Sequence, residues 1–163
     1  MNIALIGMPT CGKSTVGVVL AKMLGMNFVD SDILIQNEYN SKLSDLIKRY
    51  GTDGFIDIES KVIQNINLTN TVIATGGSAV YSNRAIMHLK DISKVVYLKV
   101  PLESIKKRMN NMRTRGVVIE DGKTLDDLFL ERKSLYEKYA DFVVDETGKS
   151  LEETVNSLVK LFN

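Results

Sequence analysis

The segment from Gly7 to Ser14 fits the phosphate-binding pattern G-x-x-x-x-G-K-[ST] at every specified position. A short apolar run, Asn2–Ile6, precedes it, and Thr15–Leu24 carries apolar residues at helical spacing. In such a strand–loop–helix context, the backbone N–H groups of the loop face a polyphosphate at the helix N-terminus. We expect Lys13 to reach the β- and γ-phosphates and the Ser14 hydroxyl to ligate Mg²⁺. The sequence therefore predicts a nucleoside-triphosphate site.

Two carboxylates, Asp30 and Asp32, directly follow the second apolar run, Met26–Val29. At the carboxyl end of a parallel strand they stand at the edge of the sheet where ligands bind. One can hold Mg²⁺ or its water, and the other can orient and deprotonate an acceptor hydroxyl. Asp is also a favoured N-cap for a helix, so one of the two can serve both purposes. Beside a phosphate loop, the pair indicates a kinase.

Other nucleotide-binding classes fit the chain less well. GTPases read their base with an Asn-Lys-x-Asp motif, and the chain contains no Asn-Lys pair. Asp145–Gly148 matches Asp-x-x-Gly by its letters, but it follows the last predicted strand, where a switch loop cannot lie. Motor and assembly ATPases are longer than 163 residues. The length suits a small-molecule kinase, in which a sheet, a substrate lobe and a lid fill the chain.

The elements that must position these residues alternate between short strands and helices. The expected strands are Asn2–Ile6, Met26–Val29, Thr71–Thr75, Lys94–Val100 and Phe142–Val144. The expected helices are Thr15–Leu24, Ile33–Tyr50 with a break at Ser41, Phe55–Ile66, Ser82–Leu89, Leu102–Asn111, Leu125–Tyr139 and Leu151–Phe162. This alternation predicts a three-layer α/β domain over residues 1–163, with a parallel sheet between helices. The segment Arg113–Lys123 lacks periodicity and is expected to be a mobile loop.

The composition argues against several partners. The net charge of +1 lacks the basic excess typical of nucleic-acid binding. No apolar run approaches the ~20 residues that a membrane helix needs, and the N-terminus does not resemble a signal peptide. The single cysteine, Cys11, excludes an intramolecular disulfide. We therefore expect a cytoplasmic protein without nucleic-acid or membrane partners.

Four segments occur here in the order and spacing of shikimate kinases: Gly7–Thr15, Asp30–Asp32, Ala74–Val80 and Glu131–Tyr136. The chain resembles this family over essentially its whole length. The resemblance implies a P-loop kinase with strand order 2-3-1-4-5, an acceptor-binding lobe at 33–66 and a lid at 111–123. It implies transfer of the γ-phosphoryl group of ATP to the 3-hydroxyl of shikimate with Mg²⁺, in a monomer that binds the small-molecule substrate and ATP.

The resemblance also assigns roles to residues. It implies that Lys13, Asp32 and the lid residue Arg115 are catalytic, with Asp32 as the base, and that Ser14 and Asp30 lie at the metal. The implied nucleotide-binding residues are Gly7, Thr10, Cys11, Gly12, Lys13, Ser14, Thr15, Arg108, which would stack on adenine, and Arg115. The implied acceptor-binding residues are Asp32, Ile56, Gly76, Gly77, Ser78 and Arg132, the last pairing with the shikimate carboxylate.

Four positions depart from the family pattern. Ile56 stands where a second arginine clamps the substrate carboxylate, and Ser78 replaces the third glycine of a triplet. Thr10 replaces a glycine of the phosphate loop, and Gly116 replaces a proline of the lid. Loss of the arginine favours a different hydroxyl acceptor, whereas retention of the other elements favours shikimate. A catalytically weak nucleotide-binding module is a further alternative, and substrate-stimulated ADP release would distinguish it.

Cys11 lies within the phosphate loop beside Lys13, at the N-terminus of the predicted helix. Both a nearby cation and a helix N-terminus lower the pKa of a thiol. Cys11 is either a small residue that fills the loop or a reactive thiol; in the second case we expect a thiol reagent to modify it and bound ATP to protect it.

Overall fold

The computed structural model describes residues 1–110 and 122–163. Within these ranges, five parallel strands form one sheet in the order β2-β3-β1-β4-β5. The strands are β1 (Asn2–Ile6), β2 (Asn27–Asp30), β3 (Thr71–Ala74), β4 (Ser93–Lys99) and β5 (Phe142–Asp145). This confirms the predicted fold class and strand order. The predicted lid at 111–123, including Arg115 and Gly116, lies almost wholly outside the described residues.

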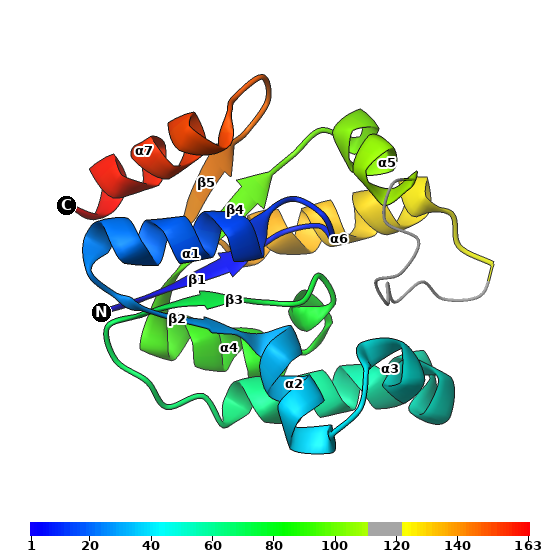
Figure 1. Ribbon diagram of the computed structural model, residues 1–163. Coiled ribbons are helices and arrows are strands. Elements are labelled where there is room, and N and C mark those ends of the chain that lie inside the picture. The colour runs from blue at the N-terminus through cyan, green and yellow to red at the C-terminus, as the bar shows by residue number, and fades with distance from the viewer. Residues whose placement is uncertain (111–121) are drawn as a thin grey trace.

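Helices cover both faces of the sheet (Figure 1). They are α1 (Lys13–Leu24), α2 (Ser31–Tyr39), α3 (Leu43–Gln64), α4 (Asn83–Ile92), α5 (Leu102–Asn110), α6 (Leu125–Tyr139) and α7 (Leu151–Phe162), with a short 3₁₀ helix at Ala79–Tyr81. Helices α1 and α7 pack against each other on one face, and α4 and α6 lie on the other. No helix of the described ranges is long and apolar enough to cross a membrane.

The central strand β1 is buried along its whole length. Its apolar side chains pack with those of β3 and β4 against the helices on both faces. A strand covered on both faces has no polar side, which explains its nearly continuous apolar sequence. Because β1 ends at Ile6, the burial of this strand fixes the point where the phosphate loop begins.

Helices α2 and α3 pack on each other around a second apolar cluster, formed by Ile35, Leu46, Phe55, Ile58 and Val62. The predicted helix Ile33–Tyr50 is interrupted at Asn40, which adopts a left-handed conformation, close to the expected break. The expected gap between Tyr50 and Phe55 is wrong, because α3 continues through it with a kink at Gly51.

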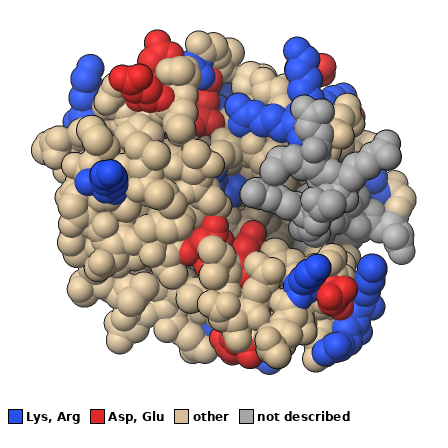
Figure 2. Space-filling view, in the orientation of Figure 1, with Lys and Arg blue, Asp and Glu red and all other residues tan. Residues whose placement is uncertain are grey.

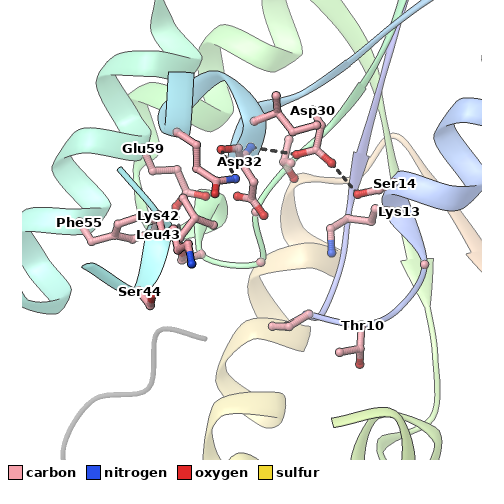
Figure 3. Close-up of a pocket in the computed structure, with 18 of the residues that line it drawn as sticks. Thr10, Lys13, Ser14, Asp30, Asp32, Lys42, Leu43, Ser44, Phe55 and Glu59 are labelled. Carbon is pink, nitrogen blue, oxygen red and sulfur yellow. Dashed lines mark hydrogen bonds between the residues drawn. The ribbon is translucent and has the colours of Figure 1, made fainter. Parts of the chain in front are cut away.

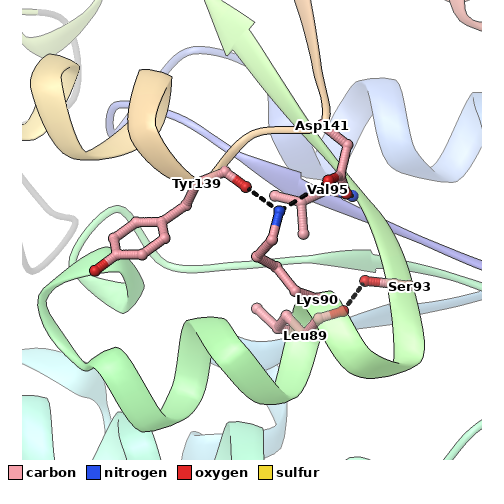
Figure 4. A network of polar contacts seen from close by, with 6 residues as sticks. All are labelled: Leu89, Lys90, Ser93, Val95, Tyr139 and Asp141. Atoms are coloured by element: carbon pink, nitrogen blue, oxygen red, sulfur yellow. Dashed lines mark hydrogen bonds and ion pairs between the residues drawn. The ribbon is translucent and has the colours of Figure 1, made fainter.

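A polar network fastens the end of α6 to the sheet (Figure 4). Lys90 Nζ donates to the Tyr139 carbonyl at 2.9 Å and to Asp141 Oδ1 at 2.8 Å. Asp141 Oδ2 accepts from the Val95 amide at 2.8 Å. Burial opposes ionisation of Asp141, but its hydrogen bonds with Lys90 and Val95 outweigh this and lower its pKa. The network ties α4, α6 and β4 together, and α6 carries Arg132.

Candidate active site

The phosphate loop closes around the Lys13 side chain. Lys13 Nζ donates to the carbonyl oxygens of Gly7 and Met8, each at 2.8 Å. Lys13 is the first residue of α1, yet only 7% of the residue is exposed. A desolvated ammonium held by backbone carbonyls is a fixed positive charge, which suits it to stabilise negative charge on a phosphate.

Ser14 and Asp30 meet at the edge of the loop. Ser14 Oγ donates to Asp30 Oδ2 at 2.5 Å. Asp30 Oδ1 accepts from the Asp32 amide at 2.9 Å and so caps the N-terminus of α2. Asp30 is therefore the helix cap that the sequence allowed, and its role at a metal stays a prediction. Mg²⁺ is commonly held by one or two protein oxygens together with substrate phosphates, and this hydroxyl–carboxylate pair fits that chemistry.

A cavity of about 480 Å³ opens beside the phosphate loop. Figure 3 shows Lys13 and Asp32 pointing into it from opposite sides. In the space-filling view, acidic side chains gather beside the hollow on this face (Figure 2). The predicted site residues that line it are Thr10, Gly12, Lys13, Ser14, Thr15, Asp30, Asp32, Gly76, Gly77, Ser78 and Arg132. The fold thus brings the phosphate loop and most of the expected acceptor residues into one space.

The side of the cavity formed by Asp32, Glu59, Gly76, Gly77, Ser78 and Arg132 is called the acceptor wall below. Close approach of the backbone builds it. A Cβ atom on Gly76 would contact Glu59 Oε1 and lie 3.0 Å from Asp32 Oδ1. A Cβ atom on Gly77 would lie 2.8 Å from Pro9 Cδ and 2.9 Å from Arg132 Nη1. Glycine at these positions therefore lets two carboxylates, the phosphate loop and an arginine converge on one stretch of chain.

Glu59 belongs to this wall, although the sequence analysis did not select it. Only 1% of the residue is exposed, and its Oε2 accepts from Ser78 Oγ at 2.5 Å. Its Oε1 has no hydrogen-bond partner within the described ranges. Burial raises the pKa of the carboxyl to about 7, although the Ser78 hydrogen bond lowers it. The available signal was an acidic residue in helical phase with Phe55 and Val62, two buried residues of α3.

Thr10 and Arg108 interact within the loop. Thr10 has a φ of 64°, a left-handed conformation that is strained for a β-branched residue. This explains why glycine is expected there, and the buried Thr10 hydroxyl has no partner among the described residues. Arg108 Nη1 donates to the Thr10 carbonyl at 2.9 Å, and Arg108 does not line the cavity.

The structure argues against a reactive thiol at Cys11, whose reactivity stays a prediction. Cys11 is 1% exposed, and it is not among the residues that line the cavity. Lys13 Nζ lies 3.6 Å from Cys11 Sγ. Burial raises the pKa of the thiol and outweighs the opposing effect of the Lys13 charge. Gly7 likewise does not line the cavity, although its carbonyl holds Lys13.

Ile56 does not line the main cavity. It lines a second cavity of about 260 Å³ together with Thr52, Asp53, Tyr81, Lys123, Leu128 and Glu131. Its neighbour Phe55 lines the main cavity instead, one position earlier on α3. Ile56 lies in the same cavity as Tyr81. The predicted contact between residue 56 and the acceptor stays a prediction.

Comparisons with known proteins agree with this geometry. A family model described as shikimate kinase matches residues 9–163. A shikimate kinase of Clostridium botulinum (strain Loch Maree / Type A3) is 38% identical, with 99% of this chain and 95% of the relative aligned. One of Persephonella marina is 33% identical, covering 97% and 96% of the two chains. The structure of an Acinetobacter baumannii shikimate kinase in complex with shikimate superposes with a TM-score of 0.90 at 29% identity, covering 98% of this chain and 91% of that one.

Proposed function

The chain belongs to the shikimate kinase family, and we propose that it transfers the γ-phosphoryl group of ATP to the 3-hydroxyl of shikimate, giving shikimate 3-phosphate and ADP. The observation that carries the proposal is the junction at Gly77. This residue packs between Pro9 of the phosphate loop and Arg132 of the acceptor wall. A phosphate held by the loop and an acceptor held by the wall would therefore share one cavity.

The nucleotide is bound by the phosphate loop in this proposal. Lys13 supplies a fixed positive charge to the β- and γ-phosphates, and the start of α1 directs backbone N–H groups at them. Ser14 and Asp30 would hold Mg²⁺ beside the phosphates. When bound, the ion neutralises charge that develops on the phosphate oxygens during transfer.

The acceptor is bound by the opposite wall. Arg132 pairs with the substrate carboxylate, since a guanidinium can form two parallel hydrogen bonds with it. Asp32 accepts the proton of the acceptor hydroxyl as its oxygen forms a bond to the γ-phosphorus. The bond from that phosphorus to the β–γ bridging oxygen breaks, and ADP leaves with the electron pair. Lys13 stabilises the charge on the transferring group.

A monomer as the active unit is part of this proposal, and light scattering of the purified protein would test it. The expected cytoplasmic location is part of the same proposal.

A coupled assay of ADP release tests the function directly. Wild-type protein should release ADP in a shikimate-dependent manner, and mass spectrometry should identify shikimate 3-phosphate. Lys13→Ala should lower the rate at least about a hundredfold, because it removes a charge from the transition state. Asp32→Asn should lower kcat on the same scale while nucleotide binding is retained. Lys22→Ala, at an exposed lysine of the same helix, serves as the matched control.

Three outcomes would contradict the proposal. ADP release that shikimate does not stimulate would exclude shikimate as the acceptor, and a panel of polyols and hydroxy acids would then identify another. ATP binding without turnover on any of them would indicate a binding module. Full turnover by Asp32→Asn would exclude Asp32 as the base.

A further inference from the structure

Arg132 is the one arginine among the described residues that lines the main cavity. It lies on α6 with only 1% of its surface exposed. Its Nη1 lies against the backbone of Gly77, where a Cβ atom would approach within 2.9 Å. A long side chain at the end of a helical stem has many rotamers, so its productive orientation depends on the groups that contact it.

Tyr81 contacts Arg132 in two ways. The guanidinium carbon lies 5.1 Å from the centre of the Tyr81 ring, within the range of a cation–π interaction. Arg132 Nε donates to the Tyr81 hydroxyl oxygen at 3.2 Å. The first contact holds the plane of the guanidinium, and the second fixes its Nε edge. Together they restrict rotation about the last bonds of the arginine side chain.

Glu131 and Lys123 in turn hold Tyr81. Tyr81 and Glu131 line the second cavity together, and Tyr81 helps to lower the pKa of the Glu131 carboxyl, after the larger effect of Lys123. Since the Tyr81 hydroxyl accepts from Arg132, it can donate its own proton to Glu131. Lys123 Nζ forms an ion pair with Glu131 Oε2 at 2.9 Å. These three residues line the second cavity, so the chain of contacts runs from that cavity to the main one through Arg132.

Ile56 lines the second cavity beside this chain of contacts. An alkyl side chain there offers no hydrogen bond to Glu131 or Tyr81. The Glu131 carboxylate is therefore directed at Tyr81 and Lys123 rather than at residue 56. Residue 56, where the family pattern has an arginine, thus lies in the same cavity as Glu131 and Tyr81, and Tyr81 contacts Arg132.

We propose that Tyr81 is a positioning residue: supported by Glu131 and Lys123, it fixes the guanidinium of Arg132 for the carboxylate of the acceptor. The inference rests on the proposed function for the identity of that carboxylate. It does not make Tyr81 a contact of the substrate; the tyrosine acts through Arg132.

Steady-state kinetics with Tyr81→Phe provide the first test. This variant keeps the aromatic ring and removes only the hydroxyl. The KM for shikimate should rise about five- to tenfold, as expected for losing a hydrogen bond that orients a charged group, while the KM for ATP is unchanged and kcat stays within about twofold. The methyl ester of shikimate lacks the carboxylate charge, so its kcat/KM should not respond to Tyr81→Phe. Tyr139→Phe, whose hydroxyl contacts Asn83 instead, is the matched control.

A double-mutant cycle and a rescue variant separate positioning from a general structural role. In an Arg132→Ala background, Tyr81→Phe should have no further effect on shikimate, because the group that it orients is gone. Glu131→Gln keeps an oxygen that can accept from Tyr81, so it should raise the KM for shikimate less than Glu131→Ala does. Equal effects of Tyr81→Phe with and without Arg132 would overturn the proposal, and so would equal effects on shikimate and its ester.

An NMR measurement makes the test independent of activity. The Arg132 Nε–H resonance, identified by its loss in Arg132→Lys, should exchange slowly with water in wild type and at least about tenfold faster in Tyr81→Phe. Unchanged exchange would show that Tyr81 does not hold the guanidinium. A wild-type protein that does not use shikimate would refute the proposed function and the role of Tyr81 toward shikimate, and the exchange rates would still decide whether Tyr81 orients Arg132.

Discussion

Replacing Glu59 by glutamine should make the stability of the protein respond differently to pH. Burial raises the pKa of this carboxyl from 4.5 to about 7. In the unfolded chain the group ionises near its ordinary pKa. Between those two values, the folded protein therefore binds a proton that the unfolded chain has lost. The free energy of unfolding falls as pH rises through this window, because the folded state must either keep the proton or bury a charge.

The magnitude follows from the pKa difference. At about 1.4 kcal/mol per pH unit, raising the pKa from 4.5 to about 7 corresponds to about 3 kcal/mol of unfolding free energy. This contribution is present below pH 4.5 and is lost by pH 8. Glutamine has the shape of the protonated acid and does not ionise. Glu59→Gln should thus match wild type near pH 4.5 and exceed its unfolding free energy by about 3 kcal/mol at pH 8.

Urea unfolding of the nucleotide-free protein, followed by circular dichroism at pH 5, 6, 7 and 8, measures this difference. Asp57→Asn removes a carboxylate from the exposed side of the same helix and controls for the change in net charge. Ser78→Ala removes a hydrogen bond that lowers the Glu59 pKa, so its stability should fall more steeply with pH than that of wild type. A stability difference between wild type and Glu59→Gln that does not vary with pH would refute the reasoning.

Three further predictions concern the phosphate loop and the second cavity. Thr10→Gly should raise the unfolding free energy by about 1 kcal/mol in urea titrations. The free energy gained by relieving the left-handed strain exceeds the free-energy cost of the entropy that glycine adds to the unfolded chain, and a loss of stability would contradict this. Ile56→Arg should lower the KM for shikimate by less than about threefold, because Glu131 in the same cavity accepts its hydrogen bonds; a larger effect would show that residue 56 reaches the acceptor. Cys11 should react with a thiol reagent at least about tenfold more slowly than glutathione at pH 7.4, with or without ATP, as judged by mass spectrometry; rapid labelling that ATP prevents would restore the expectation from sequence.

The sheet and the phosphate loop could be predicted from the sequence because their signals are local. A strand buried on both faces is apolar along its length, as β1 is, and the loop after it has a fixed spacing. The loop's position at the carboxyl edge of the sheet then follows from the parallel topology. Asp30 and Asp32 follow from the same rule, because Asp30 ends β2 and Asp32 lies two residues beyond it.

The parts that were missed depend on contacts between distant segments. Cys11 has the neighbours that lower a thiol pKa, but its burial under the loop decides the direction, and burial is a property of the packed fold. Glu59 is in helical phase with Phe55 and Val62. Its contacts with Ser78 and Gly76, which lie on a distant segment, are not visible in that periodicity. The same phase places Phe55 in the main cavity and Ile56 in the second one.

The departures from the family pattern are linked through the acceptor wall. Ser78, in place of a glycine, uses its hydroxyl on Glu59, so its added side chain is engaged by the wall itself. Ile56, in place of an arginine, borders the Tyr81–Glu131 pair that contacts Arg132. In the proposed binding mode, Arg132 is the one described arginine that contacts the substrate carboxylate, so binding depends strongly on its orientation. Tyr81 contacts the Nε edge and the face of this guanidinium, and a planar guanidinium pairs with the two oxygens of a carboxylate in a way that a neutral polyol cannot reproduce.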